Sequence, residues 1–212
     1  MKVFDLSHEF RNGMPVYPGD SPPSIIDQAT LEKDHYNQKL LTFGSHTGTH
    51  LDAPAHLIPG GATLDRMPVE AFIGPGRILD VAGLFNREIG PESIAPFLQG
   101  LEPGGFILFR TGWDAFWGTD RYFEGFPVLS LDAARLVASF SPKGVGLDAI
   151  SADPAGSREL PVHRLLLGRG IIIVENLANL AAPPAAGFLF SALPLKISRG
   201  DGSPVRATAV LP

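Results

Sequence analysis

The segment at residues 46–56, HTGTHLDAPAH, constrains the fold of this chain more than any other stretch. On one unbroken helix, with about 100° between successive residues, Asp52 would point roughly 120° away from His46, so the histidines and the aspartate would not meet. Gly48 permits unusual backbone angles, and Pro54 disfavours helical geometry at the residue before it. We therefore predict a loop or a short irregular turn that folds around a common centre.

The same segment is rich in metal-ligating side chains. It holds three of the six histidines, His46, His50 and His56, together with the carboxylate of Asp52. Imidazole nitrogens and carboxylate oxygens are ligands that Zn²⁺ and Mn²⁺ accept readily. The segment lies between two apolar stretches, and a polar group close to a core must be paired or must bind something. Because the chain has no cysteine, any metal ion has to bind histidine and carboxylate side chains.

Two residues far along the chain are further candidate ligands. His163 lies in a helix predicted at 161–167, and Glu175 follows the apolar run 171–174, which fits a buried strand. Ligands of α/β proteins gather beyond the carboxyl ends of strands. Taken singly, an ordinary helix histidine and a strand-end ion pair are the alternatives for these two residues.

Five candidate ligands result, namely His46, His50, Asp52, His163 and Glu175. A catalytic zinc ion usually takes about three protein ligands. Two ions bridged by Asp52 would use the five residues better. The residues therefore favour a two-metal site over a single ion.

Short apolar runs bounded by turn residues predict most of the strands. The predicted strands are 3–6, 24–31, 39–43, 77–81, 105–109, 144–147, 171–174, 188–197 and 205–211. Helices are predicted at 91–98, 130–138 and 161–167, the first and last beginning with proline and the second with an N-cap serine. Strands and helices interleave loosely, so we predict the α/β class with mixed strand directions.

The overall composition fits one globular domain. The chain has 212 residues and shows no long linker or internal repeat, so we treat 1–212 as a single domain. The net charge is -5 and no run of Lys or Arg exceeds two residues, which argues against nucleic acid and anionic membranes as partners. The N-terminus lacks an apolar signal stretch and no apolar run is long enough to span a bilayer, so we expect a cytoplasmic protein.

Several other polar residues have simpler interpretations. The stretch 148–153, which follows a predicted strand, is interpreted as a turn with Asx-type capping in preference to a catalytic element. The sequence RGDG at 199–202 is interpreted as a tight turn. His8 and His35 are expected to be structural or exposed.

The segment 46–56 resembles the HxGTHxDxPxH signature of the cyclase family of metal-dependent hydrolases, which includes bacterial kynurenine formamidases, isatin hydrolases and a dienelactone hydrolase. The resemblance extends over nearly the whole chain. DLSH at 5–8 is similar to the opening of the family, and PVYPGD at 15–20 is similar to its substrate loop. TGW at 111–113, GLD at 146–148, ENL at 175–177 and GSPVR at 202–206 follow in the expected order.

The resemblance implies a swivelling β/β/α domain with a mixed sheet and a two-metal site. It implies that His46, His50 and Asp52 bind the first ion. Asp52, His163 and Glu175 would bind the second. The implied ions are Zn²⁺, two per subunit, or Mn²⁺. The implied assembly is a homodimer or homotetramer whose subunits help to shape each other's pockets.

The resemblance also assigns two residues around the substrate. His56, the last histidine of the signature, becomes the catalytic acid/base. Tyr17 becomes an aromatic floor for substrate binding, at a position where kynurenine formamidases usually have tryptophan.

These features predict a metal-dependent hydrolase of a small amide, with an aryl formamide such as N-formylkynurenine as the leading substrate. Divalent ions lower the pKa of a coordinated water from ~15.7 to roughly 7. His56, with an ordinary pKa of about 6.5, can take the proton of that water and deliver it to the leaving group. Two alternatives stay open, namely hydrolysis of a cyclic lactam or lactone, and metal-dependent binding without turnover. An oxidoreductase lacks support because no Gly-x-Gly-x-x-Gly run follows a strand.

Overall fold

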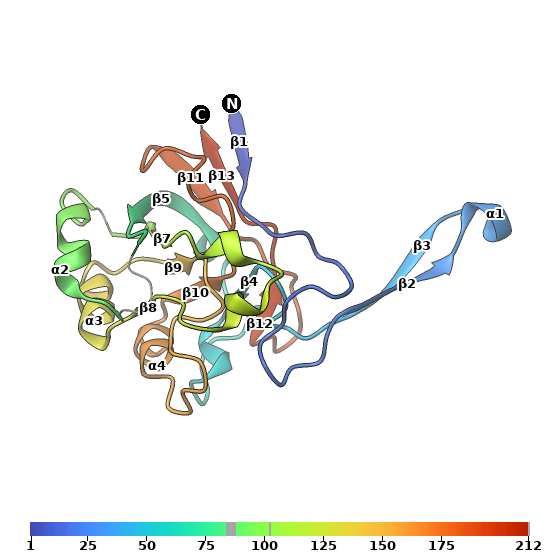
Figure 1. The fold of residues 1–212 in the computed structure, drawn as a ribbon, viewed down its shortest axis with the longest axis horizontal. Helices are drawn as coiled ribbons and strands as arrows, with labels where there is room; N and C mark the ends of the chain where they lie inside the picture. The colour runs from blue at the N-terminus through green and yellow to red at the C-terminus, as the bar shows by residue number, and fades with distance from the viewer. Residues whose placement is uncertain (84–87, 102, 212) are drawn as a thin grey trace.

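The computed structural model describes residues 1–83, 88–101 and 103–211, and within these residues a curled, mixed nine-stranded sheet forms the centre of the molecule (Figure 1). Its strands are β1 (Lys2–Asp5), β4 (His50–Asp52), β5 (Ile73–Asp80), β7 (Phe106–Arg110), β9 (Gly144–Leu147), β10 (Ile172–Glu175), β11 (Phe188–Ser191), β12 (Gly202–Pro204) and β13 (Thr208–Leu211). They lie in the order β1-β13-β11-β5-β7-β9-β10-β4-β12. β5, β7, β9 and β10 run parallel, and the other neighbours are antiparallel. The predicted α/β class with a mixed sheet is confirmed.

Helices cover one face of the parallel strands. They are α3 (Leu131–Ser139), α4 (Pro161–Gly168) and the short α2 (Pro91–Ile94), which continues as a 3-10 helix at Ala95–Phe97. The hydroxyl of Ser130 accepts a hydrogen bond from the backbone N–H of Ala133 at 3.1 Å, so the predicted N-cap of α3 is confirmed. α4 begins at Pro161 as the sequence predicts.

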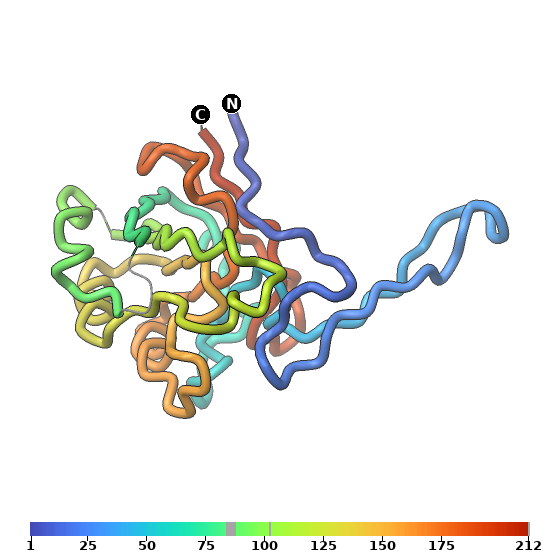
Figure 2. The backbone as a smooth tube through the Cα atoms, viewed as in Figure 1, coloured from blue at the N-terminus to red at the C-terminus, as the bar shows by residue number. Residues whose placement is uncertain are grey.

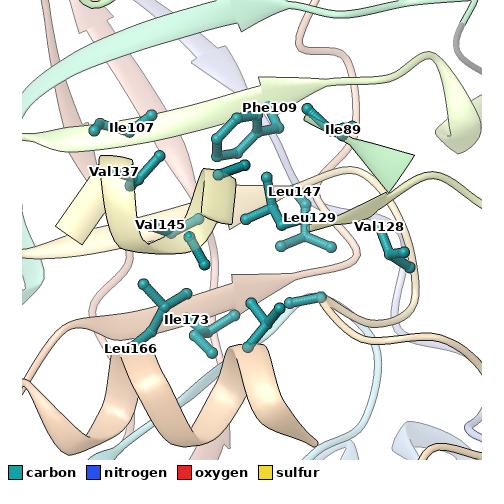
Figure 3. Packing of buried hydrophobic residues seen from close by; sticks show 14 of the residues in the cluster. Ile89, Ile107, Phe109, Val128, Leu129, Val137, Val145, Leu147, Leu166 and Ile173 are labelled. Carbon is teal, nitrogen blue, oxygen red and sulfur yellow. The ribbon is translucent and has the colours of Figure 1, made fainter. Parts of the chain in front are cut away.

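Alternation along the strands divides the core into two layers. On β7, Ile107 and Phe109 face the helices, while Phe106 and Leu108 belong to a second cluster on the opposite face of the sheet. Figure 3 shows the helix-side core, where Val137 of α3 and Leu166 of α4 pack onto the strands. Each such side chain contributes about 1.5–3 kcal/mol when it leaves water. Burial of these side chains therefore fixes α3 and α4 against the sheet.

A long hairpin projects away from this body (Figure 2). It consists of β2 (Ser24–Ala29), the short α1 (Leu31–Asp34) at its tip, and β3 (Gln38–Thr42). We call residues 24–42 the arm. All five residues of β3 are exposed, including Leu40 at 48% and Leu41 at 50%.

The smaller elements complete the described chain. β6 (Glu88–Ile89) and β8 (Val128–Leu129) form a separate two-stranded sheet. Further 3-10 helices lie at Pro54–His56, Val69–Phe72, Trp113–Phe116 and Asp120–Phe123. No helix of the described residues has the length and apolar character needed to cross a membrane.

Four of the predicted strands have a boundary that differs by two residues or more from the structure. The strand predicted at 77–81 begins at Ile73 and ends at Asp80. The strand predicted at 24–31 ends at Ala29, because Leu31 begins α1. The strand predicted at 188–197 ends at Ser191, and the strand predicted at 205–211 begins only at Thr208. Proline accounts for part of this shortening, since Pro194 has no N–H for a ladder and makes only an isolated bridge with Val205. The short strands β4, β6, β8 and β12 were not predicted.

Candidate metal centre

The register between β4 and β10 builds the centre of the site. Glu175 pairs with His50, and Ile173 pairs with Asp52, in an antiparallel ladder. Because side chains alternate along a strand, His50 and Asp52 share one face while Leu51 points into the core on the other. The shared face is the helix-covered one, since Ile173 belongs to the helix-side core. Carboxylates and imidazole thus meet between the sheet and α4.

The prediction that the whole of residues 46–56 is irregular is therefore wrong for the central part, which is a strand. The breaks predicted on either side do occur. Gly48 has a φ of 67°, and a Cβ there would lie 2.6 Å from Cε of Met14. Ala53 is extended, and Pro54–His56 then forms a 3-10 turn. Strand pairing on both sides of residues 50–52 supplied the regular structure that local spacing did not reveal.

Asp52 faces three histidine rings, and Glu175 faces two. Asp52 Oδ1 lies 2.6 Å from His46 Nδ1 and 3.3 Å from His50 Nε2. Its other oxygen, Oδ2, lies 3.6 Å from His163 Nε2. Glu175 Oε1 lies 3.1 Å from His163 Nε2, and Oε2 lies 3.6 Å from His50 Nε2. The structure therefore brings all five predicted ligands together.

These five residues form two sets of ligand atoms that share Asp52. One set is His46, His50 and Asp52, and the other is Asp52, His163 and Glu175, and the ligand atoms of each set lie within 4.8 Å of one another. Four of the five residues are buried, and His46 is half-buried. Each set offers the imidazole nitrogens and carboxylate oxygens that divalent transition metals prefer.

The outward nitrogen of each of these histidine rings has its own acceptor. His50 Nδ1 lies 2.8 Å from the carbonyl of Gly48, and His163 Nδ1 lies 2.6 Å from Asp153 Oδ2. His46 Nε2 lies 3.0 Å from Asp201 Oδ2. With a metal bound, a histidine that donates its outward N–H would present the lone pair of its inward nitrogen to the ion, which is the arrangement that metal-binding histidines adopt.

Two of those acceptors, Asp153 and Asp201, were missed by the interpretation of the sequence. Asp153 also accepts the backbone N–H groups of Val162 and His163, both at 3.0 Å, so it caps the start of α4. The predicted helix start at Pro161 was the sequence signal that could have pointed to a carboxylate capping that helix. Asp201 lies 155 positions from His46, and no local pattern links them.

The prediction of local Asx-type capping in 148–153 is wrong for Asp148. This buried carboxylate instead accepts backbone N–H groups of Thr111 and Gly112 on a distant loop, at 2.8–3.0 Å. Burial raises the pKa of Asp148 to about 6, although the hydrogen bonds from Thr111 oppose that rise. Asp148 thus ties two loops together at the ends of the parallel strands.

Histidine rings stabilise the charged carboxylates of the site. Burial alone would raise the pKa of Asp52, but hydrogen bonds from His46 and His50 outweigh burial and hold this pKa well below its usual range. Burial lowers the pKa of His163, yet hydrogen bonds with Asp153 and Glu175 raise it well above the ordinary value. In the described residues, no Lys or Arg forms an ion pair with Asp52 or Glu175.

This donor set fits divalent metal ions. A buried carboxylate must be paired or must coordinate a metal, because leaving its charge uncompensated is very costly. Here the imidazole rings are the compensating groups, and their inward nitrogens are aimed at the carboxylates in the way metal ligands converge.

His56 lies beside the two sets and belongs to neither. Its ring centroid is 4.0 Å from that of His46 and 6.4 Å from that of His163. The side chain is 27% exposed, and its Nδ1 lies 3.8 Å from Asp201 Oδ2. Burial lowers the pKa of His56 in spite of the neighbouring Asp52 carboxylate. His56 is therefore neutral near pH 7 and can accept a proton.

A cavity of about 320 Å³ opens in front of these groups. Pro15, Val16 and Tyr17 line one wall, and Ile150 and Leu160 add further apolar surface. The hydroxyl of Tyr17 accepts the N–H of Gly156 at 3.3 Å, which links the loop carrying Tyr17 to the loop before α4. The predicted substrate residue therefore lies in the same cavity as the predicted ligands and His56.

Asn176 lines the same cavity and supports the site through hydrogen bonds, a role that the sequence analysis did not assign to it. Its Nδ2 donates to the carbonyl of Gly48 at 2.9 Å, and its Oδ1 accepts from the hydroxyl of Tyr122 at 2.7 Å. Gly48 thereby holds both Asn176 and His50.

His8, expected to be structural or exposed, is half-buried and stacks on Trp117 with ring centroids 4.0 Å apart. His35 is exposed.

Known proteins share the sequence and the fold of this chain. Residues 4–154 match the model of the family described as "Putative cyclase". A kynurenine formamidase of Paracidovorax citrulli is 36% identical over 213 residues, covering 99% of this chain and 97% of that protein. The structure of isatin hydrolase A from Labrenzia aggregata, bound to benzyl benzoate, superposes with a TM-score of 0.90 at 27% identity, covering 99% of this chain and 93% of the other. A structure described as a potential metal-dependent hydrolase with cyclase activity is 30% identical, with a TM-score of 0.82 and coverage of 98% and 96%.

Fold and donor cluster together define the class of the protein, a metal-dependent hydrolase. Within that class, the chain belongs to the cyclase family named above, as its sequence signature implied.

Proposed function

We propose that this chain is an arylformamidase that hydrolyses the amide C–N bond of N-formylkynurenine. The observation that carries the proposal is the pair of donor sets sharing Asp52, with His56 beside them in one cavity. The full-length similarity to a kynurenine formamidase supports an acyclic formamide as the substrate, in preference to a cyclic lactam or lactone. It also favours an enzyme over a binding protein without turnover.

The first ion in this proposal is held by His46, His50 and Asp52, and the second by Asp52, His163 and Glu175. Zn²⁺ is the proposed ion and Mn²⁺ the alternative, because both accept this mixture of imidazole and carboxylate. When bound, such ions polarise a carbonyl group and make water acidic enough to attack it near neutral pH.

His56 is the proposed acid/base. Its lowered pKa keeps the ring neutral, so it accepts the proton of the attacking water. It then delivers that proton to the amide nitrogen as the C–N bond breaks, which lets the arylamine leave uncharged. General acid–base help of this kind is worth roughly 10²–10⁴ in rate.

Tyr17 is the proposed floor for the aryl ring. Its ring is half-buried and packs against the helix-side core, so only one side of it borders the cavity. A flat apolar wall of this kind positions an aromatic substrate by stacking and by excluding water.

We also propose that the enzyme works as a homodimer or homotetramer joined through the arm. The arm holds five large exposed apolar side chains, namely Ile26, Leu31, Tyr36, Leu40 and Leu41, which are 48–62% exposed. A two-stranded ribbon is only marginally stable alone in water, and clustered exposed apolar residues mark association surfaces. The cytoplasmic location expected from the sequence stays a prediction.

Three substrates decide the chemistry. Protein reconstituted with Zn²⁺ or Mn²⁺ is assayed with N-formylkynurenine, isatin and a simple lactone, with His56→Ala as the matched variant. We expect turnover of the formamide and loss of at least about 100-fold in kcat for His56→Ala at unchanged metal content. Preferential hydrolysis of isatin or the lactone would replace the proposed substrate, and metal-loaded protein without any turnover would favour the binding protein.

A further inference from the structure

Asp201 is anchored beside the centre by its backbone. It immediately precedes β12, whose first residue, Gly202, pairs with Asp52. The carbonyl of Asp201 accepts the N–H of Ala53 at 2.8 Å. The main chain at Asp201 is therefore tied to the strand that carries Asp52.

The Asp201 carboxylate faces two histidines of the signature segment. Its Oδ2 lies 3.0 Å from His46 Nε2 and 3.8 Å from His56 Nδ1. One carboxylate thus lies within hydrogen-bond distance of a candidate metal ligand and 3.8 Å from the candidate acid/base, and the two rings lie 4.0 Å apart.

Gly202 makes this arrangement possible. A Cβ at this position would lie 2.5 Å from His46 Cε1 and 2.9 Å from His46 Nε2, closer than real contacts allow. The His46 ring therefore packs directly onto the backbone of β12. That close approach places Nε2 within reach of the neighbouring Asp201.

We infer that Asp201 is a positioning residue that serves His46 and His56 together. It accepts the outward N–H of His46, which aims Nδ1 at Asp52, and it orients His56 towards the cavity. The part concerning His56 rests on the proposed function, whereas the part concerning His46 needs only metal binding. The two parts therefore have separate measurements.

Asp201 differs from an ordinary exposed ion-pair partner. The side chain is 45% exposed, and flexible exposed pairs contribute little. Here the hydrogen bond from Ala53 fixes the backbone from which the carboxylate extends, so less further ordering is needed to hold the ring. Outer partners of metal-binding histidines typically change metal affinity by about 10–100-fold.

The first experiment measures Zn²⁺ affinity and stoichiometry by competition with a chromophoric chelator. Asp201→Ala is expected to lower the affinity for the Zn²⁺ ion held by His46 by about 10–100-fold. Asp201→Asn keeps an acceptor oxygen and is expected to lose less, and it is the variant to use if the alanine protein folds poorly. Asp132→Asn, on an exposed ion pair of α3, is the matched control and should bind like wild type.

The second experiment measures kcat at saturating metal in a double-mutant cycle with His56→Ala. Asp201→Ala should lower kcat by about 10-fold when His56 is present, and by less than about 2-fold when His56 is already alanine. Equal losses in both backgrounds would overturn the role towards His56. An independent structural effect of Asp201 would give such equal losses.

Other results would overturn the role towards His46. Unchanged zinc affinity in Asp201→Ala is one. Another is a third ion per chain that wild type binds and Asp201→Ala loses, because His46, His56 and Asp201 would then form a metal site of their own. If no amide is hydrolysed by wild type but zinc affinity still falls in Asp201→Ala, the proposed function fails while the role towards His46 stands.

Discussion

His50 and Glu175 face each other across the β4–β10 ladder, with His50 Nε2 3.6 Å from Glu175 Oε2. The two residues come from strands 125 positions apart, and only sheet pairing brings them together. Because side chains alternate along a strand, a slip of one residue in this register would turn His50 away from Glu175. The geometry of the centre is therefore set by the same pairing that forms the sheet.

Asp153 should control the affinity of the second set of ligands. Its carboxylate holds His163 Nδ1 at 2.6 Å, so Asp153→Asn weakens this hydrogen bond and frees the ring to turn. We expect zinc to dissociate about 10–100-fold more readily from one of two sites. Calorimetric titration of the metal-free protein would measure this, and Asp132→Asn is the control. Two unchanged binding steps would contradict the role given to Asp153.

Removal of metal should destabilise the wild-type protein. An ion that binds only the folded state adds about 2.7 kcal/mol of stability at a concentration 100 times its Kd. A chelator should therefore lower the Tm, and added Zn²⁺ should restore it, as followed by differential scanning calorimetry. Asp52→Asn removes the shared carboxylate charge, so its Tm should respond little to zinc. A Tm insensitive to chelator in wild type would speak against metal binding by these residues.

His8 should make the protein sensitive to acid. Burial against Trp117 lowers the pKa of His8 to about 4, although Asp114 opposes the shift, and Nε2 has no hydrogen-bond partner in the described residues. The ring is neutral in the folded chain but protonates near pH 6.5 when unfolded. Its contribution is therefore complete above pH 6.5 and is lost as the pH falls towards 4.

Linkage sets an upper limit of about 3 kcal/mol on this effect, and partial exposure of the ring reduces it to roughly 1 kcal/mol. His8→Phe keeps the stacking and cannot protonate. Urea unfolding at pH 7 and pH 4.5 should show a smaller acid loss for this variant than for wild type. Identical losses in the two proteins would exclude His8 as the sensitive group.

The arm should control the oligomeric state. Leu40 is exposed on β3 opposite Ile26 of β2, so Leu40→Lys places a charge in the middle of the proposed contact. We expect light scattering coupled to size-exclusion chromatography to show a shift from dimer or tetramer to monomer. Val69→Lys changes an apolar residue outside the arm that is 61% exposed, and it should leave the mass unchanged. A wild-type monomer, or a variant that keeps its mass, would refute the proposed contact.

Much of the centre was predictable because its chemistry is concentrated in one short segment. The signature histidines and Asp52 indicated metal ligands, and the position of Glu175 at the end of an apolar strand indicated a further one. β4 itself was not predicted, because His50, Leu51 and Asp52 form too short a run to show alternation. Asp153 and Asp201 were missed since each contacts its histidine through the fold and through no fixed spacing. The arm was predicted as two strands, but its apolar run at Leu40 and Leu41 gave no sign that both residues face outward.

The placement of β4 between β10 and β12 has a dynamic consequence. Its backbone is pinned on both flanks, so the amide of Leu51 should be among the slowest in the chain to exchange with deuterium. Exchange of this amide would require global unfolding of the protein, because local opening would not expose it. His50 and Asp52 flank that amide, so they would hold their geometry for as long as the protein stays native.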